Sequence, residues 1–260
     1  MNFDDATSVR SAAPGRYDAM FPPEFSLADT RPNGGYVVAC LGRAALHAAR
    51  EAGASHEHVL AVSAQFISSP PLGPATITTS VLRVGKTATH VQASTDGVLA
   101  FFTLGSLTPA SEPFWGTVAP VELPPIEVCA PSPIAADRGL TLLFDPATSF
   151  TMTPDGPVVT GGGEFRCWLI DHHRDAIDTV GQIYAADCIP PATFSVVMTG
   201  WVPTLNMSVY MRALPAPGPL RIRFRAQVIQ DGFADEICEA WDMDGRLVLQ
   251  STQIVALRLT

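Results

Sequence analysis

The sequence predicts an α+β protein made of two tandem repeats, each with one central helix wrapped by a curved antiparallel sheet. Three observations support this prediction: a helix of small side chains that recurs later in the chain, turn motifs repeated at a nearly constant spacing, and strands with alternating apolar residues. The 260 residues are 47% hydrophobic and only 16% charged, so the chain can build a substantial core.

The first helix is expected within residues 31–50, RPNGGYVVACLGRAALHAAR. It opens on Gly34 and Gly35, which are poor helix formers and therefore need a local reason. The apolar side chains after them are small and run most of the way round the helix, which is typical of a buried helix that other backbone approaches closely. Residues 175–188, DAIDTVGQIYAADC, have a similar helix-like pattern in the second half.

Two turn motifs occur in both halves of the chain. Gly-Pro follows a Pro-rich turn at residues 73–74 and again at 218–219, and Asp-Gly separates two apolar runs at residues 96–97 and 244–245. Asp-Gly between apolar runs is a strong hairpin signal. The two motifs are almost equally far apart in each half, so we interpret the chain as a duplication.

Strand periodicity supports this interpretation. Residues 220–229, LRIRFRAQVI, alternate apolar and polar side chains, and residues 204–212, TLNMSVYMR, do the same. A period of two predicts strands with one dry and one solvated face. The apolar set of the first of these strands is Leu220, Ile222, Phe224, Ala226 and Val228.

The Pro-rich residues 108–137 predict an extended connector and not a third domain. We therefore expect an N-terminal repeat over residues 1–107 and a C-terminal repeat over residues 138–260, whose opening strands lie between residues 138 and 170. One helix wrapped by a curved sheet, present twice, is the double hotdog arrangement. Small side chains in the helix would let the sheet curve around it at close range.

Composition excludes several classes of function. The net charge is −9, Lys86 is the only lysine, and no basic run offers a nucleic-acid footprint. No apolar run is long enough for a membrane span, and the acidic N-terminus lacks the apolar core of a secretory signal. The five cysteines are scattered without a CxxC, which favours reduced thiols in the cytoplasm over disulfides or a zinc site. We expect no metal and no phosphate-cradling loop.

The order of these motifs resembles the type II acyl-CoA thioesterases, which have a double hotdog fold. The NGGY helix start, the Gly-Pro and Asp-Gly turns and the C-terminal DGRLVLQSTQIVALR carry the resemblance, which covers nearly the whole chain. It implies hydrolysis of fatty acyl-CoA, with coenzyme A as part of the substrate and no separate cofactor. After Asp187 the sequence Cys-Ile-Pro-Pro replaces a longer polar-aromatic run of the family, which leaves acyl pocket and substrate choice open.

The resemblance also implies the site. The family's aspartate, its threonine or serine and its glutamine match Asp187, Thr204 and Gln253. The aspartate would take a proton from water, and the other two would hold that water. Apart from the resemblance, the first helix begins with unpaired backbone N–H groups, and those at Gly34 and Gly35 would stabilise the oxyanion. Each chain would then have one site, with oxyanion donors from the first half and the base from the second.

The residues by themselves leave alternatives. Asp187, in apolar company near a helix C-terminus, would have a raised pKa that suits a general base, or it is an exposed turn residue. Gln253 shares the phase of the apolar residues on the last strand, so it is either a site residue or a core amide paired with backbone. The two glycines either expose N–H groups or simply permit a tight turn.

Other readings of the function stay open as well. A non-hydrolytic acyl-ligand binding protein and a thioesterase acting on a carrier-protein thioester are the alternatives, whereas a hydratase would need a paired aspartate and histidine. The sequence does not choose which cations would bind the phosphates of coenzyme A. The candidates are Arg31, Arg43, Arg83, Lys86 and the 172–174 His-His-Arg segment. Open sheet edges predict a homo-oligomer.

Overall fold

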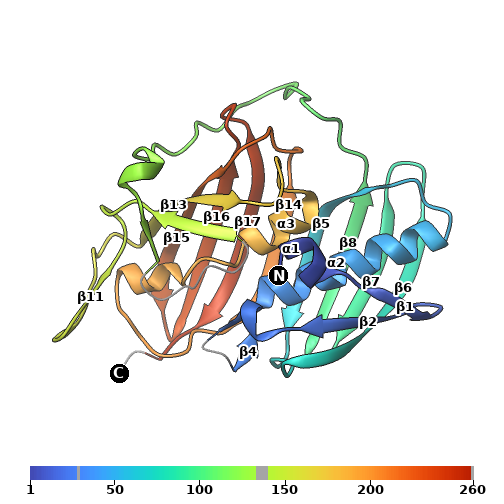
Figure 1. The fold of residues 1–260 in the computed structure, drawn as a ribbon, viewed down its shortest axis with the longest axis horizontal. Coiled ribbons are helices and arrows are strands. Elements are labelled where there is room, and N and C mark those ends of the chain that lie inside the picture. The colour runs from blue at the N-terminus through green and yellow to red at the C-terminus, as the bar shows by residue number, and fades with distance from the viewer. Residues whose placement is uncertain (28–29, 133–139, 259–260) are drawn as a thin grey trace.

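The computed structural model describes residues 1–27, 30–132 and 140–258. Its main feature is a 13-stranded antiparallel sheet in the order β1-β2-β6-β7-β8-β5-β14-β17-β16-β15-β13-β10-β9. The two halves of the chain join where β5 (His58–Phe66) pairs with β14 (Thr204–Met211). One continuous sheet therefore carries both repeats, and the helices α2 and α3 lie against it (Figure 1).

The first half contains α2 (Gly34–Glu51), the long helix that crosses its strands in Figure 1. The other elements of this half are α1 (Phe3–Thr7), β1 (Arg10–Ala13), β2 (Arg16–Phe21), η1 (Pro23–Phe25), β3 (Ser26–Leu27), β4 (Arg31–Pro32), β6 (Gly73–Val84), β7 (Thr89–Thr95) and β8 (Val98–Gly105).

The second half contains α3 (Thr179–Ala185), which packs on α2 and also contacts β5 and β14. Its other elements are η2 (Ile126–Val128), β9 (Ala130–Pro131), β10 (Leu140–Phe144), β11 (Thr151–Thr153), β12 (Gly156–Val158), β13 (Glu164–Asp171), η3 (Ala192–Ser195), β15 (Leu220–Gln230), β16 (Phe233–Trp241) and β17 (Leu247–Ala256).

The predicted duplication is confirmed by the order of the strands and by the shape of the turns. Gly73 and Gly218, which open β6 and precede β15, have φ angles of 109° and 115°. The hairpin glycines Gly97 and Gly245 have φ angles of 73° and 78°. These are left-handed conformations that favour glycine, and their close agreement shows that the same turns recur in both halves.

The helix α2 confirms the predicted buried helix and gives a reason for its small side chains. Asn33 caps it by accepting a hydrogen bond from the N–H of Tyr36 at 2.9 Å. A Cβ atom at Gly42 would lie 3.2 Å from Ile183 of α3 and 3.4 Å from Phe102 of β8. The small side chains of α2 thus allow close packing against α3 as well as against the sheet.

The second helix is shorter than its sequence pattern predicts. Residues 175–188 show a helix-like pattern, but α3 occupies only Thr179–Ala185. Asp178 starts it by accepting a hydrogen bond from the N–H of Gly181, and the chain turns before the pair Pro190 and Pro191. Proline removes a helical hydrogen-bond donor and disfavours a helical residue before it, so no helix could continue past Ile189, but α3 ends four residues earlier, at Ala185.

The alternation along β15 holds as far as Ala226 and then fails. Leu220, Ile222 and Phe224 are buried, but Val228, predicted to be on the same face, is 56% exposed. The pairing with β16 shifts register between Ala226 and Val228. A bulge of this kind inserts an extra residue, so the side chains after it change faces.

The described part of the Pro-rich connector, residues 108–132, crosses one edge of the second half without forming a domain (Figure 1). Two buried tryptophans hold it by donating indole N–H bonds to its carbonyls: Trp168 to Pro124 at 3.0 Å and Trp241 to Val118 at 2.9 Å. Residues 133–137 of the connector and Arg138 lie outside the described residues. The domain boundaries stay a prediction.

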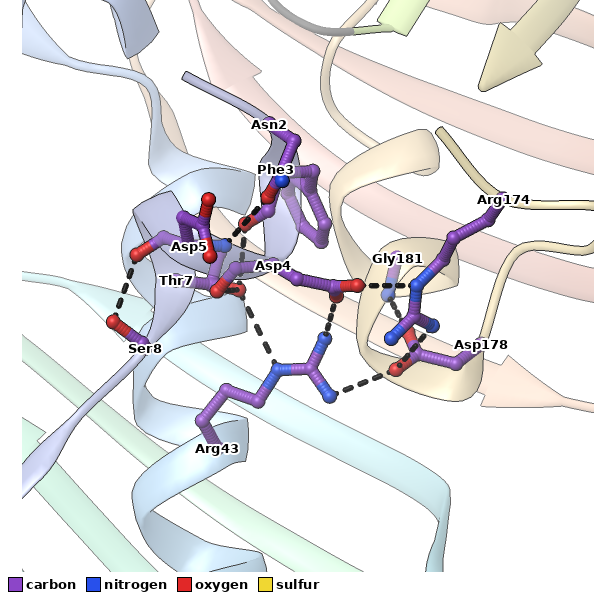
Figure 2. A network of polar contacts seen from close by, with 10 residues as sticks. All are labelled: Asn2, Phe3, Asp4, Asp5, Thr7, Ser8, Arg43, Arg174, Asp178 and Gly181. Carbon is purple, nitrogen blue, oxygen red and sulfur yellow. Dashed lines mark hydrogen bonds and ion pairs between the residues drawn. The ribbon is translucent and has the colours of Figure 1, made fainter. Parts of the chain in front are cut away.

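An ion-pair network fastens α1 to both helices (Figure 2). Arg43 of α2 contacts Asp4 and Asp178, each at 2.7 Å, and Arg174 contacts the same two carboxylates. Two of the cations considered for coenzyme A are therefore already paired. The ion pairs of Arg43 and Arg174 indicate a structural role, in which they connect the N-terminal helix α1 to α2 and to the start of α3.

Candidate active site

A cavity of about 710 Å³ lies where the two halves meet. Its wall combines the start of α2, the segment after α3, and residues of β5, β8, β14, β16 and β17. Most of its lining is apolar and includes Val37, Phe66, Ile189, Phe194 and Trp201. The few polar side chains in this wall therefore stand out as candidates for chemistry.

Asp187 lies in this wall, two residues after α3, and faces the N-terminus of α2. Its carboxylate Oδ2 accepts a hydrogen bond from the N–H of Gly35 at 2.6 Å, and its carbonyl accepts one from Nδ2 of Asn33 at 2.9 Å. Asp187 is therefore not an exposed turn residue. The first repeat holds the carboxylate of the second.

The two glycines at the start of α2 make this contact possible. A Cβ atom at Gly35 would lie 2.7 Å from Cβ of Asp187, and one at Gly34 would lie 3.0 Å from its Oδ2. Any larger residue at Gly35 would push the carboxylate away. Within the described residues no acceptor takes the N–H of Gly34, whereas the N–H of Gly35 is bound to Asp187.

Burial raises the pKa of Asp187 to about 6. Hydrogen bonds from the Gly35 N–H and from the side chains of Thr204 and Asn33 oppose this shift by stabilising the charged form. The carboxyl group is thus ionised at neutral pH but more basic than an ordinary aspartate. Such a pKa suits a general base that works near pH 7.

Thr204 and Gln253 reach the same cavity from two neighbouring strands. Thr204 begins β14 and pairs with Val255 of β17, two residues beyond Gln253. Gln253 is 5% exposed, and both residues line the cavity with Asp187. The structure therefore brings together the three side chains that the sequence predicts as site residues.

Glu236 is a further polar residue of the cavity wall that was not among the site residues predicted from the sequence. It is fully buried on β16, opposite Gln253, and its Oε2 accepts a hydrogen bond from Nε2 of Gln253 at 2.8 Å. Its Oε1 accepts from the N–H of Thr193 at 3.3 Å. The available signal was a charged residue in phase with the apolar Ala234 and Cys238 of the same strand.

Burial also raises the pKa of Glu236, to about 7. The hydrogen bonds from Gln253 and from the backbone at 192–193 oppose the shift, and the charge of Asp187 adds to it. Two carboxyl groups with raised pKa values therefore face one cavity. Such clusters are concentrated at functional sites.

Among the candidate cations, Arg31 of β4 is the one in the cavity wall, and its side chain is exposed. Arg83 and Lys86 lie at the far end of β6 and are not part of this wall. The described residues contain no group of histidine, cysteine, aspartate or glutamate that could hold a metal ion. Among the helices of the described residues, none is long and apolar enough to cross a membrane.

Known families match both halves of the chain. The model of the acyl-CoA thioesterase N-terminal domain matches residues 21–105, and that of the acyl-CoA thioesterase C-terminal domain matches residues 122–257. Uncharacterised proteins of Mycobacterium bovis and Mycobacterium tuberculosis are 29% identical over 245 residues, which cover 85% of this chain and 84% of theirs.

Solved structures agree over the full length. A candidate thioesterase II from Thermobifida fusca has a TM-score of 0.83 and 29% identity, covering 99% of this chain and 97% of its own. A conserved hotdog protein of unknown function from Alicyclobacillus acidocaldarius has a TM-score of 0.78 and 21% identity over 99% and 98% of the two chains, which shows the fold alone. The predicted double hotdog fold is confirmed, and the chain belongs to the acyl-CoA thioesterase family, whose N- and C-terminal domains it carries in tandem.

Proposed function

We propose that the protein hydrolyses acyl-CoA thioesters with a water molecule activated by Asp187. The observation that carries this proposal is the convergence of Asp187, Thr204 and Gln253 on one apolar cavity beside the start of α2. A carboxylate with a raised pKa, a hydroxyl and an amide can take a proton from a water and orient it.

The reaction would proceed without a covalent enzyme intermediate. Asp187 accepts a proton from the water while the water oxygen bonds to the thioester carbonyl carbon. The oxyanion that forms accepts a hydrogen bond from the N–H of Gly34, at the positive end of α2. The carbon–sulfur bond then breaks, the electron pair leaves with sulfur, and the proton held by Asp187 passes to the thiolate.

The substrate would lie across the cavity with its acyl chain against the apolar wall. Phe66, Ile189 and Phe194 offer the contact surface for such a chain. Arg31 at the wall is the candidate contact for a phosphate of coenzyme A. Because this wall is mostly apolar, we propose fatty acyl groups as the acyl part of the substrate.

The test is thiol release over a panel of acyl-CoA chain lengths and of the same acyl groups on acyl carrier protein. The proposal predicts turnover of at least one acyl-CoA. Tight binding without release would favour an acyl-ligand binding protein, and release only from the carrier protein would favour a carrier-protein thioesterase.

We also propose a cytoplasmic homo-oligomer. The five cysteines form no disulfide, and all four residues of the edge strand β1 (Arg10–Ala13) are exposed. An open edge can pair with another copy. Light scattering coupled to gel filtration measures the assembly, and a mass near 27.6 kDa would contradict the oligomer.

A further inference from the structure

We infer that Glu236 is a positioning residue: by accepting a hydrogen bond from Nε2 of Gln253, it turns the amide oxygen of Gln253 toward the water that Asp187 activates. This inference rests on the proposed function, since it concerns the same water. It assigns a role to the one buried carboxylate of the cavity that the reaction described above does not use.

Glu236 is itself held on both of its oxygens. Oε1 accepts from the Thr193 backbone N–H at 3.3 Å, and Oε2 accepts from Gln253 Nε2 at 2.8 Å. The side chain is fully buried, and its strand position lies directly opposite Gln253. A carboxylate fixed in this way presents an oxygen to Gln253 in one direction only.

The hydrogen bond determines which end of the Gln253 amide faces Glu236. An ionised carboxylate only accepts hydrogen bonds, so the amide must offer Nε2 to Glu236 and point its oxygen elsewhere. Within the described residues, Oε1 of Gln253 is buried and has no protein partner. Leaving a buried acceptor without a partner is unfavourable, so this oxygen favours a bound hydrogen-bond donor.

This orientation suits the proposed chemistry. A water between Gln253 and Asp187 would donate one hydrogen to the amide oxygen and the other to the carboxylate. Its lone pair would then be directed away from both groups, toward the thioester carbon. If the amide turned over, Nε2 would donate to that lone pair and make the water a weaker nucleophile.

The ionisation of Glu236 therefore matters for the orientation. The groups that interact with it electrostatically are Asp187 across the cavity and Cys238 on its own strand. Burial raises the pKa of Glu236 to about 7. A protonated Glu236 could donate to the amide oxygen and permit the reversed orientation, so orientation and pH become linked.

The kinetic test compares three variants at β16. Glu236→Leu removes the acceptor and should lower kcat about 10- to 100-fold with KM changed less than twofold. Glu236→Gln keeps the size of the side chain but has one acceptor oxygen for the two donors that Glu236 serves, so it should recover only part of that loss. Glu239→Gln is the matched control, because Glu239 lies on the same strand but pairs with Arg223 outside the cavity.

Combining Glu236→Leu with Gln253→Ala tests whether Glu236 acts through Gln253. The double variant should be no slower than Gln253→Ala alone, since the amide to be oriented is already gone. Multiplicative losses, or a KM rise with kcat unchanged, would overturn the inference.

A spectroscopic measurement tests the orientation without turnover. The Gln253 side-chain NH₂ signal is assigned by its loss in Gln253→Ala. It should shift between pH 5 and pH 9 in the wild type and stay constant in Glu236→Gln. A constant wild-type signal would overturn the inference, even if thiol release confirms the proposed function. Absence of thiol release together with a shifting signal would contradict the proposed function and leave the Glu236–Gln253 contact standing.

Discussion

The two helices of the repeats differ in ways that separate their roles. The first, α2, runs from Gly34 to Glu51 and offers an N-terminus bare of side chains. The second, α3, spans only Thr179–Ala185 and is followed by Asp187. After the duplication, the N-terminus of α2 binds a carboxylate, and the segment that follows α3 provides that carboxylate as Asp187. Neither repeat has both features, so the site exists only at their junction.

The sheet shows the same division. The inward residues at the centre of β7 and β8 are apolar: Val91, Ala93, Ala100 and Phe102. The inward residues at the centre of β16 and β17 include Glu236 and Gln253. Burying such groups weakens a core, and real proteins accept this cost at functional sites. In the cavity wall, the second repeat thus contributes buried polar side chains from its sheet, and the first repeat contributes the start of α2.

Removing the carboxylate of the second helix should have the largest effect. Asp187→Ala should lower kcat by about 10³-fold, because the water loses its general base. Thiol release from the best acyl-CoA measures this loss. Asp175→Asn, an exposed carboxyl at the other end of the same segment, is the control and should retain full activity. More than a tenth of the wild-type rate in Asp187→Ala would contradict the assigned role.

Changing the start of the first helix should have the next largest effect. In Gly35→Ala the new Cβ would lie 2.7 Å from Cβ of Asp187, so the carboxylate must move. We expect kcat to fall about 10²-fold, as for other small misplacements of a catalytic group. Gly162→Ala, whose Cβ meets only Thr160 at 3.9 Å, is the matched control. Equal rates for the two variants would mean that the contact between the helices is dispensable.

The third prediction concerns how the buried carboxyl group of Glu236 makes the stability of the folded protein depend on pH. Glu236 has a pKa of about 7 in the folded protein and an ordinary value of 4.5. The folded state therefore binds more protons between these values, and its stability falls as the pH rises from about 5 to 8. Glu236→Gln removes this dependence. The free energy of unfolding of the variant, relative to that of the wild type, should therefore rise by about 2 kcal/mol between pH 5 and pH 8. Urea unfolding at both pH values measures it, and a constant difference would show that Glu236 does not titrate in this range.

The smallest predicted effect lies at the cavity mouth. Arg31→Ala should raise KM for acyl-CoA about 5-fold and leave kcat nearly unchanged, because an exposed charge binds a phosphate weakly. Added salt should reduce the difference between Arg31→Ala and the wild type. Arg83→Ala, outside the cavity wall, provides the comparison. An unchanged KM at low salt in Arg31→Ala would place the phosphate contact elsewhere.

Local patterns in the sequence predicted much of the fold. The Gly-Pro and Asp-Gly turns demand particular backbone angles, so they mark the duplication without knowledge of any contact. The small residues of α2 likewise predict close packing. The bulge before Val228 and the early end of α3 depend on pairing with neighbouring strands and on loop geometry, which no single stretch of sequence encodes.

The site was predictable only in part for a related reason. Asp187, Thr204 and Gln253 were found through a family resemblance, and the structure places them in one cavity. The contact between Asp187 and Gly35 joins distant parts of the chain and could not be derived from either segment. The sequence shows Glu236 as a charged residue on an apolar strand face. Its contact with Gln253 follows only from the pairing register of β16 and β17, which the structure provides.

The pH dependence of kcat/KM for wild-type thiol release tests the central claim most directly. If ionised Asp187 at the junction of the repeats is the base, activity should rise with pH and reach half of its plateau near pH 6, the pKa that burial imposes on this carboxyl. A profile that is flat from pH 5 to 8, or that rises only above pH 8 as an unperturbed thiol nucleophile would require, would contradict it.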